Sequence, residues 1–68
     1  MTFIIDFEQE EDGRWLADVS GLPGVLAYGQ TPEEALTKAK ALALRVLADR
    51  LEHGEIAADL LDISFKAA

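Results

Sequence analysis

The sequence contains no cysteine and only one histidine. The missing cysteine excludes disulfides and thiolate metal sites, and a single histidine excludes a histidine-rich metal site. The chain of 68 residues therefore lacks the crosslinks that usually secure very small domains. Self-association is the remaining way to gain stability, so we predict a homo-oligomer, either a dimer or a tetramer, and no cofactor.

Long apolar runs are also missing, and basic residues are few. No apolar stretch reaches the roughly 18 residues that a membrane-spanning helix requires, and the start, MTFIID, carries an acid where a signal peptide carries bases. We therefore expect a cytoplasmic protein without membrane association. The net charge of -7 repels phosphate backbones and favours a basic partner surface, so direct nucleic-acid binding is not expected. An acidic surface that only maintains solubility is the alternative.

Three strands are indicated in the first half of the chain. Residues 3–10, FIIDFEQE, alternate between apolar and polar, which predicts a strand with one buried face. A tight-turn signal, EDG, leads to a second alternating segment at 14–20, so the two segments predict an antiparallel hairpin. Residues 25–28, VLAY, are apolar on both sides, which predicts a third strand with both faces covered.

Some apolar residues of these strands point away from the predicted core. Ile4 and Leu16 lie opposite the core set of their strands, and the third strand adds apolar residues on the same side. Such a patch is more typical of a dimer contact than of a ligand site, although scattered exposed apolar residues are also normal. We interpret this set as an oligomer interface: Ile4, Leu16, Leu26 and Tyr28.

A long helix is predicted over residues 32–53. Thr31 is the expected N-cap, Pro32 suits the first helical position, and Glu34 completes a capping box. Gly54 is expected to end the helix in a left-handed conformation, which makes His53 a helix cap rather than a catalyst. The apolar stripe that should lie on the sheet comprises Ala35, Leu36, Ala39, Leu42, Ala43, Val46, Leu47 and Leu51. A weaker stripe of Ala41, Leu44 and Ala48 is a second possible partner contact.

The remaining segment predicts a short connector after the helix and a fourth strand at residues 62–67, with Ile63 and Phe65 pointing inward. A right-handed crossover from the third strand through the helix places this strand parallel to the first. The predicted fold is a single two-layer α+β domain over residues 1–68. Its elements follow the order β-β-β-α-β, its sheet has the order 3-2-1-4, and its helix packs on one face.

Few residues support catalysis. Asp6, Glu34 and Asp62 resemble, in their element order alone, the acidic cluster with which ribonucleases H hold two magnesium ions. A remnant nuclease is therefore one hypothesis. Ser20 and Ser64 could act as nucleophiles only with a histidine as general base, and the one histidine of the sequence is expected at a helix end. The GLPG stretch lacks the length and the lysine of a phosphate-binding loop. We therefore do not expect an enzyme.

The stretch SGLPGVLAYGQTPEEALTKAK, residues 20–40, resembles the signature of HicB-family antitoxins. In this resemblance a hairpin leads to a glycine-proline corner, a short strand, a capped helix start and an alanine-rich first turn. The structural motif residues are Gly21, Leu22, Pro23, Gly24, Gly29, Thr31, Pro32, Glu34 and Ala35, with Gly54 ending the helix. The resemblance implies a partial ribonuclease-H-like domain that binds and neutralises HicA toxins, which are small basic proteins that cleave mRNA with a histidine.

Two departures from the family pattern bear on function. Many members carry a cysteine where this chain has Val25, and full-length antitoxins continue into a DNA-binding segment, whereas this sequence stops at Ala68. We therefore expect no DNA-binding C-terminal segment here. The acids expected to meet a basic toxin are Glu8, Glu10, Glu11 and Asp12, at the first hairpin. The alternative is a stand-alone oligomeric scaffold or ligand-binding module without a toxin partner.

Overall fold

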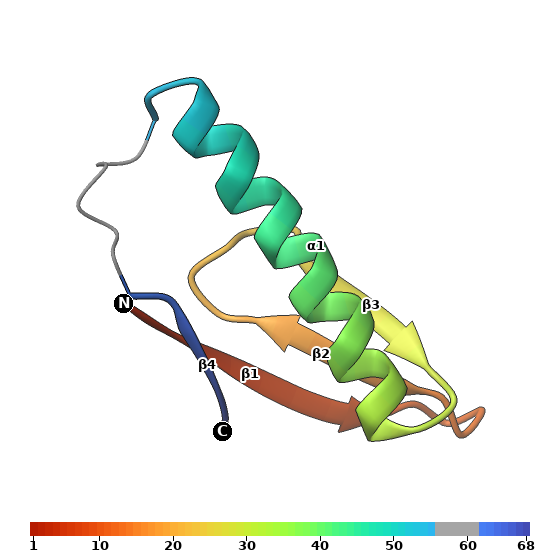
Figure 1. Cartoon of the computed structure of the whole chain (residues 1–68). Coiled ribbons are helices and arrows are strands. Elements are labelled where there is room, and N and C mark those ends of the chain that lie inside the picture. The colour runs from red at the N-terminus through yellow and green to blue at the C-terminus, as the bar shows by residue number, and fades with distance from the viewer. Residues whose placement is uncertain (56–61) are drawn as a thin grey trace.

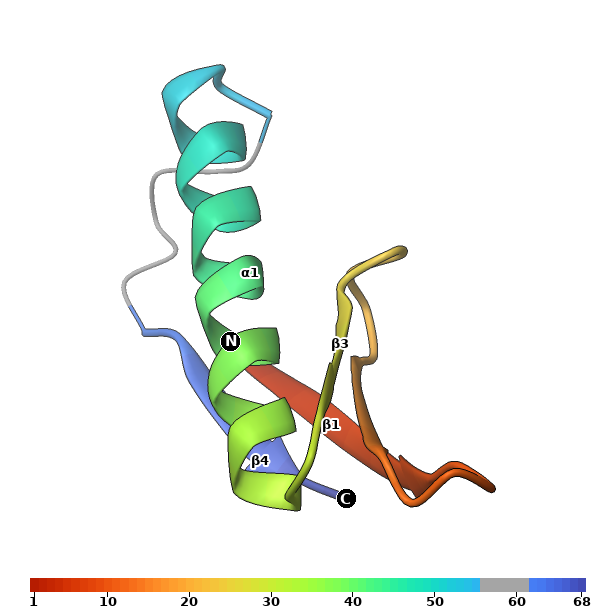
Figure 2. The same ribbon diagram turned by 90° about the vertical axis from the view of Figure 1, so that its right-hand side faces the viewer.

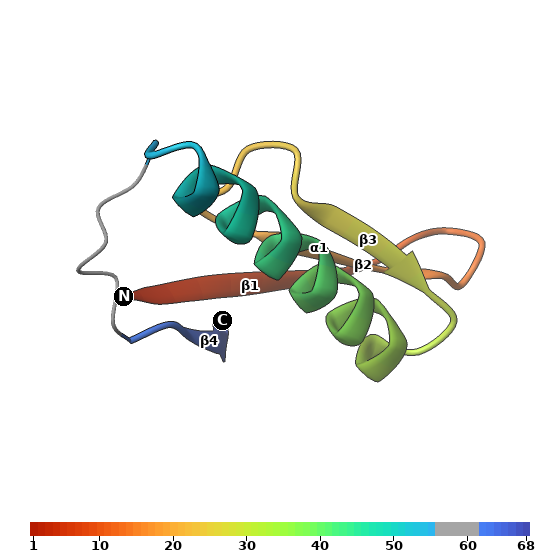
Figure 3. The ribbon, with the colours of Figure 1, turned by 45° about the horizontal axis from the view of Figure 1, so that its top comes forward.

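The computed structural model describes residues 1–55 and 62–68. Its elements are β1 (Thr2–Gln9), β2 (Trp15–Val19), β3 (Leu26–Gly29), α1 (Pro32–Glu52) and β4 (Ser64–Ala67) (Figure 1). The strands form one sheet in the order β3-β2-β1-β4, with β1 parallel to β4 and the other pairs antiparallel. The helix lies on one side of the strands (Figure 2) and crosses them diagonally (Figure 3). The predicted α+β class and strand order are confirmed.

The element bounds differ from the predicted ones by one or two residues. Val25 precedes β3 rather than starting it, although it is buried and its carbonyl accepts a hydrogen bond from Val19 N at 2.9 Å. Most of the predicted connector after the helix lies outside the described residues. Within the described part of the chain, no helix has both the length and the apolarity needed to cross a bilayer.

The core lies between the inner face of the sheet and α1. Ile5 pairs with Val19 across β1 and β2, and both side chains are fully buried. On the helix, the buried residues recur at every fourth position: Ala35, Ala39, Ala43 and Leu47. Because three of these four are alanines, the helix backbone can approach the strands closely, and the larger side chains of the strands fill the layer between them.

Gly29 permits a very close approach between helix and sheet. A Cβ atom added to it would lie 2.5 Å from the backbone nitrogen of Ala35 and 3.0 Å from its Cα. Real side chains do not tolerate such a contact with backbone, so the end of β3 meets the first turn of α1 only because residue 29 has no side chain. Leu22 and Val25 are buried in the preceding corner, which makes residues 21–36 the link that fixes the helix on the sheet.

The predicted Thr31 N-cap and the glycine end of the helix are confirmed, but the hydrogen bonds of the described residues do not include the bond from Thr31 N to the Glu34 carboxylate that the predicted capping box requires. The Thr31 hydroxyl accepts from Glu34 N at 3.1 Å, whereas the Glu34 carboxylate accepts from Lys38 Nζ at 3.2 Å. That bond, followed by one from the Gln30 backbone, lowers the pKa of Glu34. At the other end Gly54 has a φ of 69°, Gly54 N donates to Leu51 O and Glu55 N donates to Arg50 O. This is the Schellman pattern of a glycine-terminated helix.

Two burial predictions were wrong. Leu51 is 40% exposed because the helix, about 31 Å long, extends past strands of about 26 Å or less (Figures 1 and 2). Ile63 is 36% exposed because it precedes β4 and so does not share the alternation of that strand. Leu26 and Tyr28 on the outer face of β3 are each 39% exposed, because α1 packs on the opposite face, and their predicted cover by a second copy of the chain stays a prediction.

Candidate functional site

The described polar side chains are all exposed or half-buried. Among the described residues, no polar or charged side chain is buried. Because the layer between α1 and the sheet is wholly apolar, it holds the fold together but offers no hydrogen-bonding group to a ligand. Candidate functional groups therefore have to be sought in three exposed places, namely the β1–β2 hairpin, the outer face of the sheet and the C-terminal end of α1.

The β1–β2 hairpin gathers all four acids that were predicted to meet a partner. Glu8, Glu10, Glu11 and Asp12 line an open depression together with Gln9 and Arg14. The turn is closed by hydrogen bonds from Glu10 N to Arg14 O at 2.7 Å and from Gly13 N to Glu10 O at 3.0 Å. Gly13 has a φ of 92°, which is the left-handed conformation that the Asp-Gly signal predicted.

Asp12 differs from the other hairpin acids because it binds Arg14 within the chain. Its Oδ1 accepts from the backbone nitrogen of Arg14 at 3.0 Å, and its Oδ2 accepts from Arg14 Nε at 2.7 Å. These two bonds, the backbone one first, hold the pKa of Asp12 below its ordinary value. A basic partner would have to compete with Arg14 for this carboxylate, so Asp12 is the least available of the four acids.

The outer face of the sheet carries the four residues predicted as an oligomer interface, but the strand register divides them. Leu16 lies opposite Tyr28 on β3, and Leu26 is the next outward residue along that strand. Ile4 lies on the other side of the sheet's midline, where it pairs with Lys66 of β4. We call Leu16, Leu26 and Tyr28 the apolar cluster of the open face.

Acidic residues separate the apolar cluster from Ile4. Asp18 lies opposite Asp6 on one side and opposite Leu26 on the other, and Glu8 lies opposite Leu16. Ser20 Oγ donates to Asp6 Oδ2 at 2.8 Å. Sequence reasoning missed Asp18 as a site residue, although the alternation of β2 already placed it on the same face as Leu16.

Arg14 connects the hairpin with the open face. Its guanidinium carbon lies 4.5 Å from the ring centroid of Tyr28, within the range of a cation–π contact. The same guanidinium binds Asp12. One side chain therefore packs against the edge of the apolar cluster and neutralises the nearest hairpin acid, which leaves the negative charge of the open face to Asp6, Asp18 and Glu8.

The structure does not bring together the acids of the nuclease hypothesis. Asp6 is on the open face of the sheet, whereas Glu34 is in the first turn of α1, on the opposite side. The carbonyl of Asp62 accepts from the N-terminal ammonium group at 2.6 Å. A shared metal site requires oxygen ligands that converge within a few ångströms, and the sheet itself stands between Asp6 and Glu34.

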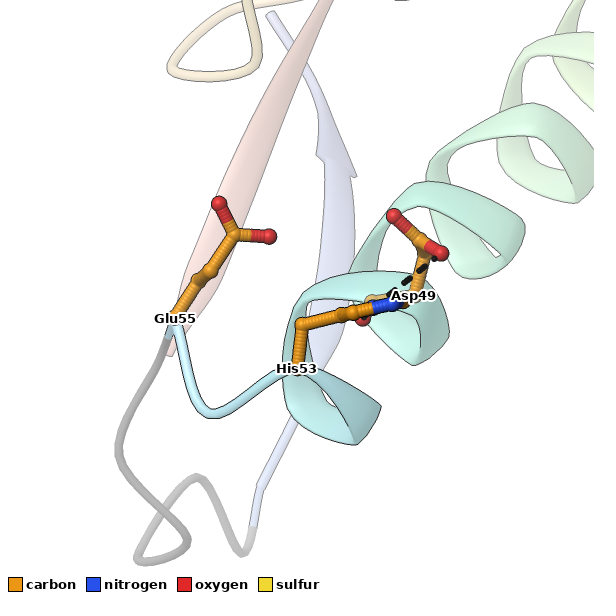
Figure 4. Close-up of side chains that lie close together, drawn as sticks. All are labelled: Asp49, His53 and Glu55. Carbon is orange, nitrogen blue, oxygen red and sulfur yellow. Dashed lines mark hydrogen bonds and ion pairs between the residues drawn. The ribbon is translucent and has the colours of Figure 1, made fainter.

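Asp49, His53 and Glu55 form a small exposed cluster at the end of α1 (Figure 4). One ligand atom from each lies within 4.8 Å of the others. His53 Nδ1 donates to the Asp49 carbonyl at 2.7 Å and lies 3.4 Å from Asp49 Oδ1. The spacing of four residues between Asp49 and His53 could have signalled their proximity. The hydrogen bond to the helix carbonyl agrees with the predicted capping role of His53.

Charge is distributed unevenly between the two layers. Residues 1–29, which contain the three antiparallel strands, have six acidic residues and one basic residue. The helix has four acidic and four basic residues. The net negative charge of the protein is therefore concentrated on the sheet and its hairpin, where the acids of β1 and β2 stand next to exposed apolar side chains.

The fold and this surface define a class, namely a small acidic two-layer α+β domain in which one face of the sheet is left uncovered by the part of the chain that the structure describes. Comparisons of the chain with protein-family models, with curated proteins and with solved structures found no match.

Proposed function

We propose that this chain is a HicB-like antitoxin domain, which binds a small basic mRNA-cleaving toxin and neutralises it by protein–protein contact. The resemblance of residues 20–40 to the family signature names the class of partner. The observation that carries the proposal is the charge distribution, because six of the seven charged residues in positions 1–29 are acidic. A surface of this kind attracts a basic protein and speeds its association.

In this proposal, the domain inhibits the toxin by covering it rather than by acting chemically on it. A basic nuclease must present cations to the RNA backbone, and carboxylates placed against those cations compete directly with phosphate. The exposed acids of the hairpin and the open face would bind these cations in place of RNA phosphate. The apolar cluster would add apolar surface that becomes buried in the complex. The helix fixes the sheet in shape, so the contact surface needs little reorganisation.

The test is coexpression with any small basic protein that is encoded beside the gene for this chain. We expect the chain to restore growth of cells that express this neighbour, and the two purified proteins to form a complex that weakens as salt increases. A toxin with its catalytic histidine replaced by alanine allows the binding measurement without cell death. Growth arrest that the chain does not relieve, together with absence of a complex, would refute the proposal.

A stand-alone homo-oligomer is the second candidate function. It is favoured by the exposure of Ile4, Leu26 and Tyr28, each between 37% and 39%, on a sheet face that no element of the described residues covers. Light scattering at micromolar concentration separates this candidate from the first. A stable dimer or tetramer with no basic gene product nearby supports the scaffold, whereas a monomer refutes it.

A further inference from the structure

We infer that the open face of the sheet, rather than the hairpin loop, is the docking surface for the basic partner, with a lysine or arginine of that partner bound between Asp6 and Asp18. This inference rests on the proposed function and goes beyond it by assigning the surface and the central contact. Three features of the described residues carry it: the pairing of two aspartates, the adjacent apolar cluster and the sign of the surrounding charge.

The first feature is the direct opposition of Asp6 and Asp18 in the β1–β2 register. Residues that lie opposite each other in antiparallel strands have Cβ atoms about 4.5–5.5 Å apart, and like charges in such positions destabilise the sheet. Neither aspartate forms an ion pair within the described part of the chain. The hydroxyl of Ser20 stabilises Asp6 alone. A cation placed between the two carboxylates would satisfy both.

The second feature is the apolar cluster beside this pair. Leu26 lies opposite Asp18 and Leu16 lies opposite Tyr28, so the apolar side chains adjoin the aspartates with no gap in the register. Exposed apolar and aromatic side chains next to charged ones have the composition of a protein–protein contact, in which the apolar part becomes buried and the charges select the partner. Of the hairpin acids, Glu8 lies opposite Leu16, and the depression that they line is formed by polar and charged residues.

The third feature is the sign of the charge, which distinguishes a basic partner from a second copy of this chain. The open face bears Asp6, Glu8 and Asp18 against two cations, Lys66 and Arg14, and Arg14 is already paired with Asp12. Two copies that met through this face would bring acids against acids, which opposes association. A partner with a basic surface gains from the same charges. We therefore commit the face to a basic protein and treat a homodimer as a competing outcome.

The experiment compares two double variants that remove the same charge. Asp6→Asn with Asp18→Asn neutralises the open face without changing side-chain shape, and Glu10→Gln with Glu11→Gln neutralises the hairpin. The probe is the histidine-inactivated basic protein encoded beside the gene, titrated against each variant at low and high salt. We expect the open-face variant to bind at least about tenfold more weakly, with a flatter salt dependence, and the hairpin variant to change by about threefold or less.

Each result decides between the alternatives. Weak binding by the open-face variant alone supports the inference, as does rescue when a partner lysine changed to glutamate is combined with Asp18→Lys. Unchanged binding by the open-face variant, with a loss in the hairpin variant, overturns the inference and leaves the proposed function standing. If the wild-type chain does not bind, both are overturned. A homodimer that the Leu16→Asp change dissociates also overturns the inference. Circular dichroism confirms that each variant is folded.

Discussion

The two faces of the sheet are formed by alternate residues of the same strands, but one face is buried and the other is accessible. On the inner face, Ile5, Ala17 and Val19 are almost completely buried beneath α1, within a cluster of apolar side chains. On the outer face, Leu16, Asp18 and Asp6 alternate with them along the same backbone and remain accessible. The difference teaches that packing specifies the inner face, whereas the outer face is free to be specified by a partner.

The largest effect should follow from truncating an inner side chain. Ile5→Ala leaves a cavity in the closed apolar layer, and we expect a loss of about 2–5 kcal/mol in the free energy of unfolding. Ile4→Ala, its neighbour on the outer face, should cost less than about 1 kcal/mol, since Ile4 is already 37% exposed. Urea unfolding followed by circular dichroism measures both. Equal losses would contradict the division between the faces.

The next effect concerns the contact that holds the helix on the sheet. Gly29→Ala places a Cβ 2.5 Å from Ala35 N, so the helix must shift, and we expect a loss of about 2–3 kcal/mol. Gly13→Ala is the matched control, because a Cβ there meets nothing within 4 Å and the cost, about 1 kcal/mol, comes from the left-handed backbone alone. Only the Gly29 variant should also move the amide resonances of the first helical turn.

A smaller effect of opposite sign is expected on the outer face. Asp18→Asn removes the repulsion with Asp6 and should raise the free energy of unfolding by about 0.2–1 kcal/mol. Glu11→Gln removes the same charge from the hairpin and should change stability by less than about 0.5 kcal/mol. A chain that becomes more stable as it loses partner binding would show that the aspartate pair is retained for function. Destabilisation by Asp18→Asn would argue against that repulsion.

The smallest effect is a pH dependence at the hairpin. Because bonds from Arg14 lower the pKa of Asp12 in the folded chain, the unfolded chain binds a proton at this site more readily. The stabilisation is therefore present above the ordinary pKa of 3.8 and is lost as the pH falls through the lowered value. Asp12→Asn should flatten this acid limb of a thermal-unfolding profile measured against pH. If the variant and the wild-type chain lose stability in the same way as the pH falls, the ion pair between Asp12 and Arg14 does not contribute to the pH dependence of stability.

Much of the fold could be predicted because its signals are local. The alternation of residues 3–10, the Asp-Gly turn, the Thr31 cap and Gly54 each act over a few residues, and the structure confirms each of them. The burial errors arose where a local pattern ended. Leu51 continues the helical stripe but lies past the sheet, and Ile63 precedes the strand whose alternation it was assumed to share.

The candidate site was less predictable because it depends on register. The sequence placed Ile4 and Leu16 on one face. The pairing of Asp6 with Asp18, however, depends on how the two strands are aligned, which the sequence pattern of each strand does not specify. The acids of the nuclease hypothesis show the same limit, since their order along the chain matched a metal site while the sheet stands between Asp6 and Glu34.

By itself the sequence determined the elements, their order and the acidic character of the chain, since hydrophobic period, capping residues and charge are properties of neighbouring residues. The requirement for glycine at position 29 comes from the tertiary structure, because the packing of α1 on β3 brings the Ala35 backbone against this residue. The tertiary structure also decided that two aspartates face each other beside an exposed apolar cluster, since only the alignment of separate strands brings those side chains together.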